Sequence, residues 1–453
     1  MKQANSFVSG SDGTRRRGLQ QTTRISRLSS FRRIWSILAM TLLVLPVLAA
    51  CTGGDDEPDR TGRVVWYQGV PPGNAVGSSA TSGELAQAAE PAQETQPAVV
   101  EPTATSDAAP PADTQSPEQP EITGKLLTND ELAQFQPNEL GNVPVFMYHN
   151  IVQEYGPGQE GDVLFRTEAE FRADLQWLYD NDFYVIPFYD YVTNQIKAPA
   201  GKKPFVLTFD DSRPNQFNYL IGADGSVTID PDSAVGIMED FFASHPDFGH
   251  TAYFAMLPIW CFDYEAPDQT PYCEQKLTWL YENGYEIGNH TWDHQDLYDQ
   301  PSDVFRTKVV DTSLWIEERV PEGKASRILI LPYGNFPNGE DADEQWDWIR
   351  NGIPTDNGLF QLTSVVAAGA NPANSPSHID FDVMSIARIG AKDYPADGEA
   401  DLFLDYWFGV FTENPESLYV SDGNPDTVVF PSWAADFLDA EKAAAEGKQV
   451  IEY

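Results

Sequence analysis

The sequence predicts an α/β fold in which parallel strands, joined by helical crossovers, wind into an open sheet or close into a barrel. Beginning near residue 142, short apolar runs alternate with longer segments that have apolar residues at helical spacing. Strands that take turns with helices pair in parallel, because each helix returns the chain across the sheet. Polar side chains directly follow several of the apolar runs, and functional sites in such folds lie at these strand ends.

Each element is expected from its local pattern. Thr167, followed three residues later by Glu170, has the capping-box pattern that begins a helix, which we expect over 167–180. Strand-like runs, most of them apolar, predict strands over 144–148, 184–187, 205–209, 252–257, 286–289, 328–331 and 383–387. Amphipathic spacing predicts further helices over 233–243, 274–281, 303–319 and 343–350. The segment 212–250 is longer than a crossover needs and predicts an elaborated loop over the site. The tail 402–453, with a helix expected over 434–445, extends the same domain.

Two short motifs carry the chemistry. One apolar run ends in Asp210 and Asp211, which places two carboxylates at the end of a buried strand. Another run is followed by His290 and His294, whose spacing lets both imidazoles face one ion. Taken singly, an Asp pair often caps a turn and a His pair often lies on the surface. Together they supply one carboxylate and two imidazoles, the pattern of a catalytic zinc with open positions, and a second carboxylate that is a candidate base.

In this order, and with their flanking strands, the two motifs resemble those of the polysaccharide deacetylase family, carbohydrate esterase family 4, over residues 143–389. The resemblance implies a distorted, incomplete (β/α) barrel. It also implies that Asp210 is the general base and that one divalent metal ion, expected to be zinc, binds to Asp211, His290 and His294. A third family-like motif at 328–334 implies that the backbone N–H of Tyr333 binds the oxyanion of the reaction.

The chain departs from the family pattern at two places. An Arg near the start of the third motif is replaced by Ile330 and Leu331, and Arg388, after a later strand, is its expected substitute. The Leu-x-His motif that supplies the general acid is missing. The strand that ends in His149 instead resembles the opening strand of permuted members, such as the poly-N-acetylglucosamine deacetylases of biofilm formation. That resemblance assigns His149 as the acid that protonates the leaving amine, and a satisfied core histidine is the alternative.

Several side chains near the predicted strand ends are expected to contact substrate. A pyranose ring has an apolar face that matches the flat area of an aromatic side chain. We therefore expect Trp292 and Phe336, together with Arg388, to bind the substrate.

The N-terminal third of the chain is expected to serve export and tethering. Residues 1–50 carry eight Lys or Arg and one acidic residue, and an apolar run over 34–50 ends in small residues. This pattern is typical of a secretory signal, with an uncleaved membrane anchor as the alternative. Cys51 follows directly, as in a bacterial lipoprotein, and is the expected lipidation site. Residues 51–135 are rich in Pro, Ala, Thr and acidic residues and predict a disordered linker to a catalytic domain at 136–453.

Charge and cysteine content limit the partners. The chain has a formal net charge of -41, which argues against nucleic acid and against anionic lipid headgroups, although such charge also serves solubility or a salty habitat. Cys261 and Cys273 flank an irregular segment in a compartment where disulfides persist, so a bridge between them is expected, with two buried thiols as the alternative.

We therefore expect an extracytoplasmic, membrane-tethered hydrolase that removes acetyl groups from a polysaccharide, with the N-acetyl groups of a hexosamine polymer as first choice. The alternatives are an O-acetyl esterase of the xylan type and a non-catalytic glycan-binding lipoprotein. A glycosidase would need two carboxylates flanking one bond and has no use for paired metal-binding imidazoles.

Overall fold

The computed structural model describes residues 124–321, 325–392 and 404–453, all within one compact unit. The predicted signal 1–50, Cys51 and most of the predicted linker 51–135 lie outside the described residues. The last part of that linker segment forms helix α2 (Asn129–Phe135), which begins with a capping box between Thr128 and Glu131. Among the described residues, none of the helices has both the length and the apolar character needed to cross a membrane.

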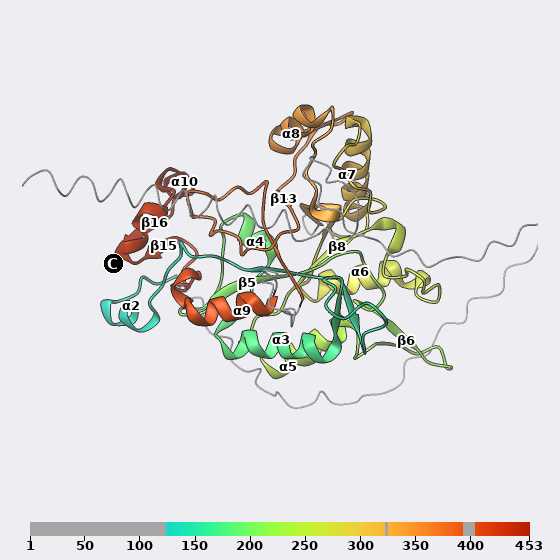
Figure 1. Ribbon diagram of the computed structural model, residues 1–453, viewed down its shortest axis with the longest axis horizontal. Coiled ribbons are helices and arrows are strands. Elements are labelled where there is room, and N and C mark those ends of the chain that lie inside the picture. Colours follow the sequence, from blue (N-terminus) through green and yellow to red (C-terminus); the bar gives the residue numbers. More distant parts are fainter. Residues whose placement is uncertain (1–123, 322–324, 393–403) are drawn as a thin grey trace, which may run out of the picture. The chain divides into compact units, whose positions relative to one another are not determined.

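The core of the fold is a curled sheet of eight strands that pair in parallel (Figure 1). Seven strands follow the order β13-β10-β9-β8-β5-β1-β14, and β4 pairs with the first half of β5. The strands are β1 (Val145–Tyr148), β4 (Phe183–Val185), β5 (Lys203–Phe209), β8 (Tyr253–Met256), β9 (Glu286–Asn289), β10 (Ala325–Ile330), β13 (Ser364–Val366) and β14 (Ile389–Gly390).

The two ends of this sheet approach each other without a full strand ladder. Val366 of β13 forms a parallel bridge with Ile386, and Ala370 forms an antiparallel bridge with Ile389 of β14. Isolated bridges at the junction, in place of a paired strand, make the barrel incomplete. The predicted distorted, incomplete (β/α) barrel is confirmed.

Helices connect most of the parallel strands. After α2, the α-helices are α3 (Glu168–Asp180), α4 (Phe188–Val192), α5 (Ala234–Ser244), α6 (Cys273–Glu282), α7 (Ser302–Glu317), α8 (Ala342–Asn351), α9 (Leu404–Glu413) and α10 (Ala440–Ala445). Thr167 begins α3 with the predicted capping box to Glu170, and Ser233 caps α5 by accepting a hydrogen bond from the N–H of Gly236.

Four two-stranded pairs lie outside the main sheet. Two are parallel, β2 (Asn150–Val152) with β3 (Phe165–Thr167) and β15 (Thr427–Phe430) with β16 (Gln449–Glu452). Two are antiparallel, β6 (Tyr219–Ile221) with β7 (Val227–Ile229) and β11 (Ile353–Thr355) with β12 (Gly358–Phe360). The long segment 212–250 thus contains a hairpin as well as the expected helix.

Two predicted elements are wrong in detail. The strand expected over 383–387 is mostly a turn, because the Asp382 side chain accepts a hydrogen bond from the Met384 N–H at 3.0 Å, and β14 begins only at Ile389. The helix expected over 434–445 is broken, because Asp439 caps a new helix through the N–H of Lys442 at 2.9 Å. Both errors arise where a short acidic side chain bonds to the nearby backbone.

Alternate strand residues face two different hydrophobic clusters. Phe205, Leu207 and Phe209 of β5 belong to the cluster that also contains apolar residues of the helices α3, α5, α6 and α9. Val206 belongs to a second cluster, which gathers residues of β1, β8, β10 and β13 within the curled sheet. Since side chains alternate along a strand, Thr208 and Asp210 continue the inner face. Strand periodicity therefore directs Asp210 toward the interior at the end of β5.

The interior of the curled sheet is narrow at β9. Tyr253 of β8 donates its hydroxyl to the carbonyl oxygen of Ile328 on β10 at 2.6 Å, passing over the strand between them. A Cβ on Gly288 of β9 would lie 1.5 Å from this hydroxyl. Gly288 is therefore required for the close approach of these three strands.

Candidate active site

The three predicted metal ligands come together at the ends of β5 and β9. Asp211 Oδ1 lies 3.4 Å from His290 Nε2 and 3.3 Å from His294 Nε2. Their ligand atoms all lie within 4.8 Å of one another. Nitrogen and oxygen ligands about 2.0–2.2 Å from one tetrahedral ion are themselves about 3.3 Å apart. The three side chains therefore have the spacing of a site for one divalent ion.

The chemistry of these atoms, like their spacing, fits a bound ion. Asp211 Oδ1 and His290 Nε2 are buried and have no hydrogen-bond partner among the described residues, which is costly unless an ion or water satisfies them. His290 Nδ1 lies 2.8 Å from the carbonyl oxygen of Ile330, and donation from this nitrogen leaves the Nε2 lone pair for a metal. Burial lowers the pKa of His294 to about 4, so this imidazole is neutral.

An uncommon backbone conformation brings these side chains together. Positive φ angles occur at Asp211 (76°), Ser212 (49°), Thr291 (66°), His294 (60°) and Tyr333 (58°). These five are half of the ten non-glycine residues with positive φ in the described part of the chain. Such conformations cost about 1–3 kcal/mol each and persist where the surrounding structure holds them. The strain is therefore concentrated at the candidate site.

Asp210 is held by a buried arginine. Arg388 Nη1 lies 2.7 Å from Asp210 Oδ1, and Nη2 lies 2.8 Å from Oδ2. Arg388 also donates to Thr208 Oγ1 at 3.1 Å and to the Ala367 carbonyl at 2.9 Å. Burial alone would raise the pKa of Asp210, but the Arg388 guanidinium, together with His290 and His149, outweighs this and lowers the pKa below its ordinary value. Asp210 is therefore an ionised carboxylate with a fixed orientation.

This arrangement corrects one expectation about Arg388. The side chain has a relative exposure of 1% and directs its guanidinium at Asp210, so it does not contact substrate. Its contact with Asp210 agrees with the other expectation, that Arg388 is the partner of the candidate base.

We expect Arg388→Met to lower the free energy of unfolding by about 3–5 kcal/mol, because it leaves the buried Asp210 carboxylate without its partner. Urea unfolding measures the change. The matched control is Arg172→Met, which breaks an exposed pair with Asp240 at 3.3 Å and should change the free energy by less than about 1 kcal/mol. Equal small effects of both substitutions would contradict the buried ion pair.

His149 lies beside Asp210, at the end of β1. Its Nε2 is 3.9 Å from Asp210 Oδ2, and its Nδ1 is buried without a hydrogen-bond partner among the described residues. Burial lowers the pKa of His149, so the imidazole is neutral. The pairing of β1 with β5 places Tyr148 opposite Phe209, which brings the next residue of each strand to the same edge. Topology thus joins two residues that are 61 positions apart.

The other predicted site residues have mixed surroundings. The Tyr333 ring lies 4.6 Å from the His294 ring, which places this residue beside the predicted metal ligands. Trp292 is partly exposed, at 37%, and is free to meet a ligand from solvent. Phe336 stacks on Trp346 at 5.0 Å and belongs mainly to the packing around α8. Substrate contact by the two aromatic residues stays a prediction.

Sequence reasoning missed two polar residues directly after the Asp pair. The Gln216 amide nitrogen donates to the backbone carbonyls of His149, at 2.8 Å, and of Asp210, which ties the ends of β1 and β5 together. Arg213 donates to the second oxygen of Asp211. Gln216 and Arg213 do not lie in an apolar run. The only sequence signal of their role is that they are close to the two carboxylates along the chain.

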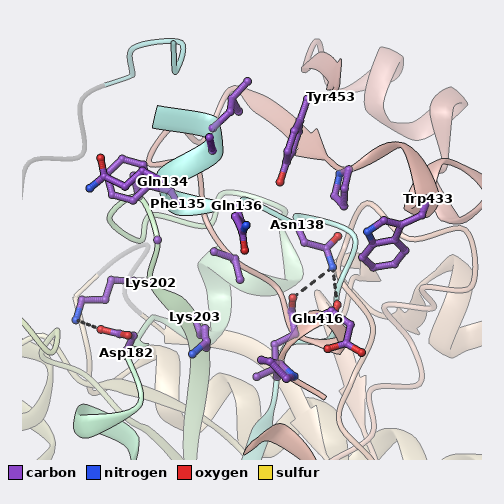
Figure 2. A pocket seen from close by; sticks show the side chains of 18 residues that line it. Gln134, Phe135, Gln136, Asn138, Asp182, Lys202, Lys203, Glu416, Trp433 and Tyr453 are labelled. Carbon is purple, nitrogen blue, oxygen red and sulfur yellow. Dashed lines mark hydrogen bonds and ion pairs between the residues drawn. The ribbon is translucent and has the colours of Figure 1, made fainter. Parts of the chain in front are cut away.

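A cavity of about 790 Å³ lies at the other end of β5 (Figure 2). It is lined in part by Phe135, Lys203, Trp433 and Tyr453, and by none of the metal-ligand residues. Asp210 lies seven residues after Lys203, which at about 3.3 Å per residue corresponds to about 23 Å along the strand. This cavity is therefore separate from the candidate active site.

Part of this chain is similar to proteins of a known family. Residues 247–343 match the family described as polysaccharide deacetylase. A Bacillus subtilis (strain 168) protein named as a polysaccharide deacetylase, YxkH, is 18% identical over 233 residues, which are 50% of this chain and 69% of that protein.

Solved structures are similar over about half of the chain. The Streptococcus pyogenes deacetylase PplD, in complex with acetate, is 18% identical and covers 55% of this chain and 92% of its own, with a TM-score of 0.39. A de-N-acetylase from Aggregatibacter actinomycetemcomitans is 15% identical and covers 58% and 100%, with a TM-score of 0.36. His290, His294 and Tyr333 all lie within the stretch that matches the family. Residues 247–343 of this chain are therefore similar to the polysaccharide deacetylase family.

Proposed function

We propose that this protein is a metal-dependent hydrolase that removes acetyl groups from an extracytoplasmic polysaccharide, with the N-acetyl groups of an N-acetylhexosamine polymer as substrate. One observation carries the proposal: the unpartnered, buried ligand atoms of Asp211 and His290 lie beside an ionised, arginine-held Asp210. This arrangement provides an ion site and a base next to each other.

When bound, the ion, which we propose to be zinc, would supply Lewis-acid chemistry at the acetyl carbonyl. Asp210 accepts a proton from the attacking water, and Arg388 keeps this carboxylate ionised and oriented until then. The backbone N–H of Tyr333 stabilises the charge that develops on the carbonyl oxygen. The carbon–nitrogen bond then breaks, acetate leaves, and the amine nitrogen takes a proton. His149, 3.9 Å from Asp210, has a short route by which to receive that proton and pass it on.

The role of His149 can be separated from a structural one. We expect His149→Ala to slow the release of acetate from an N-acetylated oligosaccharide far more than from an activated aryl acetate, whose leaving group needs no proton. The lost general acid should cost roughly 10²–10⁴-fold on the amide substrate. Steady-state rates on both substrates measure the split. Equal losses on the two substrates, with an unchanged melting curve, would assign His149 a positioning role.

The direct test of the function is the release of acetate. The purified full-length protein, loaded with zinc, is incubated with acetylated chito-oligosaccharide, peptidoglycan glycan strands and acetylated xylan. We expect acetate from the N-acetylated polymers, its loss on treatment with a chelator, and its return with added zinc. Release from xylan alone would favour the O-acetyl esterase. No release from any polymer by the zinc-loaded protein would favour a glycan-binding role.

The structure weakens one argument for a non-catalytic protein. The missing Arg of the third motif would leave the base without a partner, as expected in an inactive relative. Arg388 restores that partner with two short hydrogen bonds. This pairing supports the proposal of a hydrolase.

The location outside the cytoplasm and the lipid anchor at Cys51 are also proposals. They are supported by the basic and apolar pattern of residues 1–50 and by the disulfide between Cys261 and Cys273, a bond that persists in oxidising compartments. Membrane fractionation tests them, since Cys51→Ser should move the protein out of the membrane fraction.

A further inference from the structure

Asp211 makes a second contact that the proposed reaction does not use. Its Oδ1 faces the two histidines, whereas its Oδ2 accepts hydrogen bonds from Arg213, 3.3 Å from Nε and 3.1 Å from Nη2. The two oxygens of one carboxylate are therefore differently engaged. Because Arg213 occupies Oδ2, it leaves Oδ1 as the atom presented to an ion.

Aromatic rings hold the guanidinium of Arg213 in turn. Its central carbon lies 5.1 Å from the ring centre of Trp260 and 4.3 Å from that of Tyr264. The two rings also contact each other edge to face, with their centres 4.7 Å apart. A flat, delocalised guanidinium stacks on aromatic faces in a way that an ammonium group does not. Arg213 is thus located by the segment that carries these rings, residues 258–273, which we call the disulfide loop.

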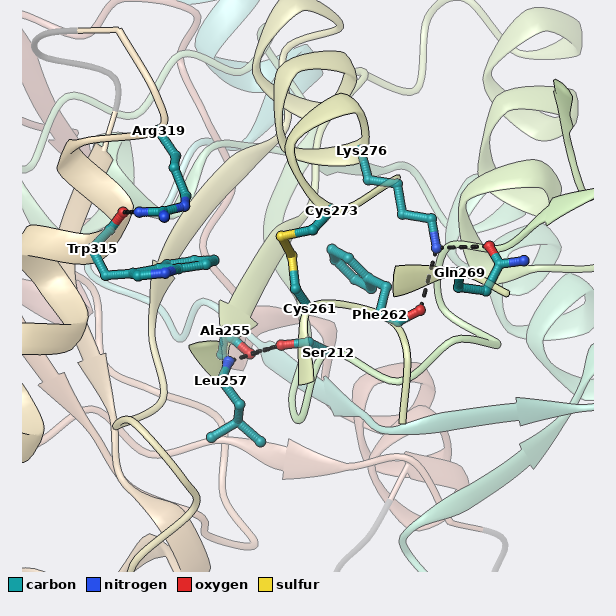
Figure 3. Close-up of a disulfide and its surroundings, with 10 residues drawn as sticks. All are labelled: Ser212, Ala255, Leu257, Cys261, Phe262, Gln269, Cys273, Lys276, Trp315 and Arg319. Atoms are coloured by element: carbon teal, nitrogen blue, oxygen red, sulfur yellow. Dashed lines mark hydrogen bonds between the residues drawn. A yellow bond between two sulfur atoms is a disulfide. The ribbon is translucent and has the colours of Figure 1, made fainter. Parts of the chain in front are cut away.

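The disulfide loop is also fastened to the backbone beside Asp211. The Phe262 N–H donates to the Ser212 carbonyl at 3.0 Å. Just before the loop, the Leu257 N–H donates to Ser212 Oγ at 2.8 Å (Figure 3). Asp211 and Ser212 both have positive φ, which costs free energy that the surroundings must offset. These hydrogen bonds hold the chain in that conformation.

The loop is closed from two sides. A disulfide joins Cys261 to Cys273, 12 residues later (Figure 3). The fully buried Lys276 donates from Nζ to the Phe262 carbonyl at 3.2 Å and to Gln269 Oε1 at 2.9 Å. The covalent bond and the buried amine together restrict the residues that contact Arg213 and Ser212.

We infer that Arg213 is a positioning residue, which the disulfide loop holds in place and which fixes Asp211 with Oδ1 toward His290 and His294. The inference rests on the metal-binding part of the proposed function. It adds a specific prediction about affinity for the ion, because partners of a metal ligand contribute through the orientation of that ligand.

Zinc affinity of the full-length protein, measured by competition with a chromogenic chelator, tests Arg213. Arg213→Met should weaken binding about 10–100-fold, the usual effect of losing a partner of a metal ligand. The matched control is Arg319→Met, which removes a guanidinium stacked on Trp315 at 4.3 Å and should leave affinity unchanged. Arg213→Lys keeps the charge without the planar fork and should recover only a small part of the loss.

Three outcomes of this measurement are informative. Unchanged affinity in Arg213→Met would overturn the inference. Full recovery in Arg213→Lys would overturn positioning in favour of charge alone. If the unaltered protein binds no zinc, the proposed function fails, and that result is distinct from a failure of the role of Arg213.

A double-mutant cycle tests whether the disulfide loop acts through Arg213. Replacing both Cys261 and Cys273 with Ser should weaken zinc binding in the unaltered background and cause little further loss in the Arg213→Met background. Serine is used in place of a reductant because free thiols bind zinc themselves. Equal losses in both backgrounds would overturn the link. If the serine protein does not fold, Tyr264→Leu, which removes the ring nearest to Arg213, takes its place in the same cycle.

Discussion

Asp210→Asn should keep the metal ion and lose roughly 10²–10⁴-fold in the rate of acetate release, the usual scale for a lost general base. Asn has nearly the same shape as Asp but cannot accept the proton of the attacking water. Asp210 is not expected to hold the ion, because both of its oxygens bond to Arg388, at 2.7 and 2.8 Å. Metal content and steady-state rate, measured on the same preparation, test both halves of this expectation.

Asp211→Asn is the reciprocal control for this prediction. It removes the negative charge from the oxygen that faces His290 and His294, so the metal content itself should fall. The opposite result, with metal lost from Asp210→Asn and kept in Asp211→Asn, would mean that the roles of the two carboxylates are exchanged. A melting curve of each variant separates either result from unfolding, since Asp210→Asn also removes half of a buried ion pair.

His290→Ala should remove most of the metal and, with it, the deacetylase activity. Two remaining ligands, Asp211 and His294, hold a divalent ion poorly, so the loss of affinity should exceed the roughly 10–100-fold that follows from the loss of a partner behind a ligand. Elemental analysis after dialysis measures the metal that stays with the protein. Unchanged metal content would sink the assignment of the site.

A second histidine provides the control for this substitution. His250 lies outside the site, where its Nε2 pairs with Glu239 at 2.8 Å. His250→Ala should therefore keep the full metal content and activity. A loss of metal from both variants would indicate general destabilisation in place of ligand removal.

The site was predictable to the extent that it depends on strand ends. Asp210, His290 and His149 each follow a strand-like run, and parallel pairing brings the carboxyl ends of neighbouring strands to one edge. The order of the motifs along the chain also resembles that of the polysaccharide deacetylase family. These signals are local, because a strand is recognised from consecutive residues and its last residue is where a polar side chain appears.

The partners of these residues were less accessible to sequence reasoning. Arg388 was proposed as a substitute partner, but its assignment to substrate contact was wrong, since only the packed structure shows that the guanidinium is buried against Asp210. The two residues are 178 positions apart. A side chain that long has many rotamers, and the packed surroundings select the one that makes this pair.

By itself, the sequence determined the alternation of strands and helices, the capped start of α3, the placement of carboxylates and imidazoles at strand ends, and the family-like order of the motifs. Each depends on chemistry within a few residues along the chain. The tertiary structure alone decided the incomplete closure of the barrel between β13 and β14, the burial of the Arg388 guanidinium, and the contact of the disulfide loop with Arg213. It also decided the positive φ angles at Asp211 and His294. These features join distant segments or strain the backbone, and they are stable only because the surrounding packing offsets their cost.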